Sequence, residues 1–279
     1  MTGSSTLFAW ATPAFFDGSP VDHTWVTNYD NRIDPHRNIQ EVVRSGALYW
    51  FCWGDFHSRS GAAHSADGLL RSTPGDVGLA QCLVKPNADS SIDPGGCGVI
   101  FDYGFDGVCH QLANQVLYVA VTSGQPVTVE GARGYTASVF LYGQYGHQQS
   151  AWLHRIASCG APPPAGARLL WERGAMVGRP DDFETRARAV LGEREPDVLN
   201  RLLALRGEVR QFTAQRSPGA MPPSAETLNA RNQNLLDQAA ALLGPDRFME
   251  IFGYDPAEKL NLVDPRLRQS PRSRPRAVQ

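Results

Sequence analysis

The chain has 279 residues, of which 42% are apolar and 19% are charged, and its formal net charge at pH 7 is −2. This composition is typical of a soluble globular protein with one large or two smaller domains, and so small a charge gives no reason to expect a nucleic-acid partner. Its apolar runs are all shorter than the roughly eighteen residues of a membrane-spanning helix, so we expect a cytoplasmic protein without a membrane span.

The first part of the chain predicts β-strands. Segments 7–16, 21–29 and 47–57 are rich in aromatic and β-branched residues and are bounded by turn-forming residues. The first segment contains a proline and has no basic residue before it, so it predicts a strand and not a signal peptide. Segment 58–98 is small, polar and glycine-rich. We interpret it as long loops around one short apolar piece, 77–84, and the loops either cover a site or are surface insertions.

The stretch from Phe101 to Ala120 predicts a loop that runs into an amphipathic helix. Its apolar residues recur at helical spacing and are Cys109, Leu112, Ala113, Val116, Leu117 and Ala120. Gly104 and Gly107 precede the helix, which places Cys109 in its first turn. The free N–H groups and partial positive charge there stabilise a thiolate, so we expect a lowered thiol pKa. A plain buried cysteine is the alternative interpretation.

The remainder predicts two further strands and then helices. Residues 125–146 contain alternating apolar positions and predict at least two strands. Segment 160–166 is a proline-rich linker. Helices are predicted at 181–191, 197–212, 224–243 and 245–252, with prolines near their starts and glycines just past their ends. The helical region therefore covers 167–263, and a basic tail that we expect to be disordered covers 264–279.

A cysteine nucleophile needs a base within hydrogen-bond reach and a group that orients the base. His23 is the first candidate for the base, because it lies in the middle of a predicted strand. Asp55 and His57, near the end of the next strand, are the candidate orienting groups. A satisfied, half-buried histidine is the alternative interpretation of His23.

Other residues are expected to line the same site. Tyr103, Gln111 and Trp25 are the candidates for substrate binding, and the backbone N–H of Cys109 and its neighbours would form an oxyanion hole. His110 is not expected to be the base, because adjacent residues on a helix diverge by about 100°.

The order of these residues along the chain resembles that of a known family. The order of histidine on an early strand, polar residue on the next strand and cysteine at a later helix start resembles the circularly permuted papain-like fold of the NlpC/P60 group, which includes the lecithin retinol acyltransferase-like proteins. In ordinary NlpC/P60 enzymes a Tyr-Gly pair and an Asp-Cys-Ser-Gly run mark the nucleophile, and the similar residues here are Tyr103, Gly104, Asp106 and Cys109. The resemblance covers residues 6–156 and departs from the pattern at Val108 and His110.

The resemblance implies an α+β fold, in which a papain-like catalytic domain at 6–159 has an antiparallel sheet and a nucleophile-bearing helix. The C-terminal helical region would follow it. The implied activity is that of a thiol amidase, peptidase or acyltransferase that forms a thioester on Cys109, with His23 as base and no cofactor. Its partner would be a peptide or acyl compound with an amide or ester bond.

Two other classes of function stay open. One is a zinc-binding protein, in which histidines and cysteines would hold the metal; they are His57, His64, Cys97, Cys109 and His110. Their spacings match no known zinc finger. The five cysteines are an odd number without a C-x-x-C pair, so we expect neither a disulfide framework nor a bound metal. A non-catalytic interaction module would use the helical half for binding, since a fold alone does not determine function.

Overall fold

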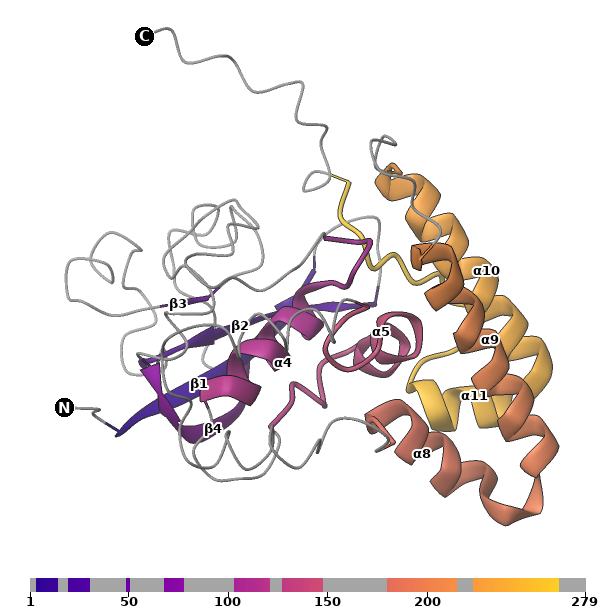
Figure 1. Ribbon diagram of the computed structural model, residues 1–279, viewed down its shortest axis with the longest axis horizontal. Coiled ribbons are helices and arrows are strands. Elements are labelled where there is room, and N and C mark those ends of the chain that lie inside the picture. Colours follow the sequence, from indigo (N-terminus) through magenta and orange to yellow (C-terminus); the bar gives the residue numbers. More distant parts are fainter. Residues whose placement is uncertain are drawn as a thin grey trace, which may run out of the picture.

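The computed structural model describes residues 4–14, 20–30, 49–50, 68–77, 103–120, 127–147, 180–214 and 223–265. In these ranges the chain has an α+β fold, in which an antiparallel sheet is followed by six α-helices (Figure 1). The α+β class, the antiparallel sheet and the C-terminal helical region are therefore confirmed. None of the described helices is long and apolar enough to cross a bilayer.

The sheet has four strands in the order β3-β2-β1-β4, and every neighbouring pair is antiparallel. The strands are β1 (Ser4–Pro13), β2 (Asp22–Thr27), β3 (Tyr49–Trp50) and β4 (Leu69–Asp76). The first three fall in segments that were predicted as strands. Register places Trp10 opposite Trp25 and Thr12 opposite His23.

The prediction of long loops on both sides of the apolar piece at 77–84 is wrong for β4. Its sequence lacks apolar alternation and contains Pro74 and Gly75, both of which are unusual inside a strand. It forms nevertheless because β4 is an edge strand that pairs with the long β1, and a proline is tolerated where no second partner strand requires its missing N–H.

The two faces of the sheet have different neighbours. Successive side chains of a strand point to opposite faces. Leu7, Ala9 and Val26 belong to the main core together with the first helix, α4 (Cys109–Ala120). Trp10 and Trp25 form a separate small cluster, and their rings are stacked with centroids 6.4 Å apart.

Helix α4 is buried on all sides over residues 109–118. It begins at Cys109, as the sequence predicts, and its apolar side chains lie in the main core. The polar residues expected on its other faces are buried as well; they are His110, Gln111, Asn114 and Gln115. The sequence pattern therefore identified the apolar face but not the second layer that covers the polar one.

The prediction of strands in 125–146 is wrong, because the described part of this segment contains helix α5 (Tyr135–Tyr142) and no strand. Seven of its eight residues are buried, so the sequence has no exposed polar positions at helical spacing that would indicate a helix. Gly134 and Gly143 flank the helix with φ angles of 75° and 80°, in the left-handed region that glycine adopts readily.

The four predicted C-terminal helices are confirmed within a few residues. They are α8 (Asp182–Leu191), α9 (Pro196–Ala214), α10 (Ala225–Leu243) and α11 (Pro245–Phe252), and a 3-10 turn at Gly192–Arg194 joins the first two. They share one core with α5, since Phe140 contacts the rings of both Phe183 and Phe252. The described parts of the two halves thus pack as one body.

Candidate functional site

Cys109 is the first residue of α4 and lies against β2. Its Sγ is 3.8 Å from the carbonyl oxygen of Asp22, and Thr24 of the same strand lies beside it. The residue is 9% exposed, and burial raises the pKa of the thiol to about 11, although the nearby polar groups of Thr24 and of the helix start act to lower it. The resting sulfur is therefore a thiol, which is opposite to the sequence-based expectation.

The structure does not bring His23 to this sulfur. Its ring stacks on Trp25, with centroids 5.8 Å apart, and is buried in the tryptophan cluster. Because side chains alternate along β2 and Thr24 contacts Cys109, His23 and Trp25 point to the opposite face of the sheet. Trp25, a candidate for substrate binding, is completely buried on that face.

His110, which the sequence analysis did not expect to be the base, contacts the same carbonyl oxygen as the sulfur. Its Nε2 lies 3.0 Å from the Asp22 carbonyl oxygen, and its Nδ1 lies 2.9 Å from Ser138 Oγ. Burial lowers the pKa of the imidazole to about 4, so the ring is neutral at pH 7. Because a carbonyl oxygen only accepts, the single ring hydrogen is on Nε2. Cys109 and His110 therefore both donate to one main-chain oxygen.

Gln111 stabilises the start of α4. Its Oε1 accepts from the N–H of Val108, 2.9 Å away, which is half of a capping box with Gln111 at the third helical position. Its Nε2 donates to Ser138 Oγ and to the Gly143 carbonyl. These three bonds fix the side chain at the start of the helix.

Tyr103 is held by the C-terminal segment. Its hydroxyl accepts from the N–H of Asp264 at 2.8 Å and contacts the Leu262 carbonyl at 3.4 Å. The side chain is buried. Tyr103 thus connects the turn before α4 to the end of the described chain.

Several candidate residues lie outside the described residues. They are Asp55, His57, His64 and Cys97. The described residues contain no group of three or more His, Cys, Asp or Glu side chains that could hold a metal ion. Of the suggested zinc set, only Cys109 and His110 are described, and both are engaged with Asp22.

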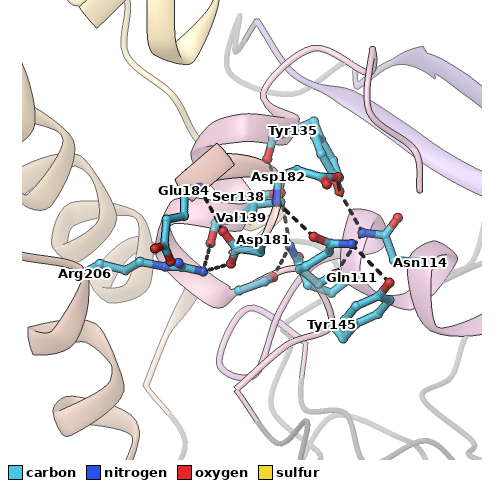
Figure 2. Close-up of polar contacts among 12 residues, drawn as sticks. Gln111, Asn114, Tyr135, Ser138, Val139, Tyr145, Asp181, Asp182, Glu184 and Arg206 are labelled. Atoms are coloured by element: carbon cyan, nitrogen blue, oxygen red, sulfur yellow. Dashed lines mark hydrogen bonds and ion pairs between the residues drawn. The ribbon is translucent and has the colours of Figure 1, made fainter. Parts of the chain in front are cut away.

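A buried polar network, which the sequence analysis missed, lies behind α4 (Figure 2). Asn114 donates to the Tyr135 hydroxyl and the Gln144 carbonyl and accepts from the N–H of Val129. The Tyr135 hydroxyl in turn donates to Asp182 Oδ2 at 2.6 Å. Burial raises the pKa of the Asp182 carboxyl. The network therefore connects α4 through α5 to the start of α8.

A buried ion pair extends the network to α9. Arg206 pairs with Asp181, the N-cap residue of α8, and also donates to the Val139 carbonyl at 3.1 Å (Figure 2). The available sequence signal for the network was the spacing of three amides on α4, since Gln111, Asn114 and Gln115 fall on one helical side.

The chain has no detectable relatives in three comparisons. No protein-family model matches it, and neither a curated protein nor a solved structure matches it significantly.

Proposed function

We propose that this protein is a cysteine-dependent acyl-transfer enzyme on a papain-like, permuted NlpC/P60-like scaffold, and that it acts as an amidase, peptidase or acyltransferase. The observation that carries the proposal is the position of Cys109. It begins α4, packs against an antiparallel sheet, and lies at the helix end where backbone N–H groups have no partner within the helix. That is the setting in which a thiol nucleophile and an oxyanion hole coincide.

In the proposed reaction, Sγ attacks the carbonyl carbon of an amide or ester and the thiol proton passes to a base. The tetrahedral oxyanion accepts hydrogen bonds from the N–H groups of Cys109 and His110, the amine or alcohol leaves with a proton, and a thioester remains. Water or an amine then releases the acyl group. The Asp22 carbonyl holds the S–H in the resting state.

The base is assigned to none of the described residues. His23 points to the opposite face of the sheet, and the low pKa of about 4 makes His110 a weak base at neutral pH. Asp55 and His57, the candidates for orienting the base, lie outside the described residues.

Trapping of an acyl-enzyme tests the proposal. We expect p-nitrophenyl acetate to give a burst of nitrophenol and an acetylated protein, with the acetyl group on Cys109 by peptide mass mapping. Cys109→Ala should abolish the burst, and Cys159→Ala is the matched control because it removes another thiol. A burst that persists in Cys109→Ala, or acetylation spread evenly over the cysteines, would contradict the proposal.

The second candidate is a non-catalytic interaction module on the same scaffold. It is favoured by the separation of His23 and Cys109 on two faces of β2 and by the raised pKa of the buried thiol. In that case Cys109→Ala would retain every partner bound by the native chain in a pull-down, and no ester or amide would acylate the protein.

A further inference from the structure

The segment Leu260–Asp264, which we call the strap, returns from the C-terminal helices to the turn that precedes α4. Figure 1 shows it in yellow, passing from the helices back toward the sheet half. It has no regular secondary structure, yet its apolar side chains are buried; these are Leu260, Leu262 and Val263. Its position in the molecule therefore depends on specific contacts.

Helix α10 holds the strap through two side-chain amides. Asn229 accepts from the N–H of Val263 at 2.9 Å and donates to the carbonyl of the same residue at 2.8 Å. Gln233 Oε1 accepts from the N–H of Leu260 at 3.0 Å. These bonds satisfy strap backbone groups that a strand would otherwise pair.

The other side of the strap holds the turn before α4. Tyr103 bonds to the strap at Asp264 and Leu262, and Gly104 fits directly against Val263. A Cβ on Gly104 would lie 2.6 Å from Val263 Cγ1, so only glycine allows this approach. The Gly104 N–H bonds to the Gly107 carbonyl at 2.7 Å, which closes the turn just before Cys109.

We infer that the strap is a conformational clamp, whose release loosens the turn at residues 103–107 and opens access to the Cys109 sulfur. The side chains of Tyr103, Asn229 and Gln233 hold it through hydrogen bonds to its backbone. Because the strap has no helix or strand of its own, these side-chain bonds and the burial of its apolar residues are what hold it, and weakening the bonds raises the frequency of local opening. The inference concerns access to the thiol, and it holds whether or not the thiol is catalytic.

Cysteine labelling and hydrogen exchange in the full-length protein test the clamp. Tyr103→Phe removes both strap bonds of the hydroxyl, and Asn229→Ala removes both bonds to Val263. We expect each variant to raise the iodoacetamide labelling rate of Cys109 and the amide exchange rate of residues 103–108 by about tenfold, since one or two lost hydrogen bonds change a local opening equilibrium by roughly this factor. Should Asn229→Ala fail to fold, the milder Tyr103→Phe decides alone.

Two control variants separate the clamp from a general loss of stability. Asn234→Ala removes an exposed amide from the same helix and should change neither rate. Ala187→Gly destabilises α8 far along the chain and measures the labelling that global unfolding alone produces. If the clamp variants label no faster than Ala187→Gly at equal unfolding free energy, the strap is ordinary core and the inference is overturned. Failure of the acylation experiment would leave this result unaffected.

Discussion

The α4–α5 pair and the C-terminal helices are both buried against the same core, but they are stabilised by different kinds of contact. In α8, α10 and α11 the helix ends follow local rules, although α10 also binds the strap backbone through Asn229. Asp181 and Ser224 cap helix starts, and Gly253 ends a helix with φ 81°. In α4 and α5 the polar side chains point inward and bind backbone groups from other segments. Asn114, for example, pairs with Val129 and Gln144.

The difference shows where the stability of each region originates. A local cap can be read from a few neighbouring residues, and its loss costs about 1 kcal/mol. A buried amide that satisfies distant backbone groups forms only after the chain has folded, and its loss leaves those groups without partners. We therefore expect the α4–α5 pair to be the more sensitive region, and three experiments test this in order of expected effect.

The largest effect is expected for Asn114→Ala. The substitution leaves the N–H of Val129 and the carbonyl of Gln144 buried without their partner and creates a small cavity. We expect the free energy of unfolding to fall by about 3 kcal/mol or more, measured by urea denaturation. Asn234→Ala, an exposed amide on α10, should change it by less than about 0.5 kcal/mol. Equal losses in the two variants would remove the distinction between the regions.

A pH-dependent effect is expected from His110. Its pKa is lowered to about 4 in the folded protein, from about 6.5 when unfolded, so between these values the unfolded chain binds more protons. The contribution of His110 to the free energy of unfolding is therefore fully present above pH 6.5. It is lost as the pH falls toward 4, by up to about 3 kcal/mol.

The matched variant His110→Gln isolates this contribution, because every other titrating group is retained. Urea midpoints between pH 7 and pH 4.5 should fall less steeply for the variant than for the native chain. Parallel slopes would mean that the imidazole titrates alike in the folded and unfolded states, against its burial in the structure.

The smallest effect is expected for Ser224→Ala at the start of α10. The serine hydroxyl accepts from the N–H of Thr227, and the residue is exposed. We expect a loss of about 1 kcal/mol in thermal or urea unfolding, and Ser224→Asp should restore most of it because aspartate is an equally good cap. A loss as large as that of Asn114→Ala would show that the local and tertiary contacts are of similar weight.

The same contrast explains which parts of the fold the sequence predicted. The helices α8 to α11 were found because prolines, glycines and apolar stripes mark them locally. Helix α5 was missed because burial on nearly all sides removes its period, and β4 was missed because only pairing with β1 makes it a strand.

The candidate site was predictable to the same extent. The position of Cys109 at a helix start follows from the nearby glycines and the apolar period, and it is confirmed. Strand alternation also correctly places His23 and Trp25 on one face. Alternation cannot indicate which face α4 will cover, and burial of the sulfur depends on the packing of the complete chain, so neither followed from the sequence.

The contacts of Cys109 and His110 with the Asp22 carbonyl do not depend on the side chain at position 22. The accepting oxygen belongs to the main chain, whereas the Asp22 carboxylate forms an ion pair with Arg133. Replacing the aspartate would alter an exposed ion pair, yet the oxygen facing the thiol and the imidazole would persist with any amino acid there. Substitutions at position 22 would thus leave the contact with the sulfur in place, and only a change in the backbone path of β2 could remove it.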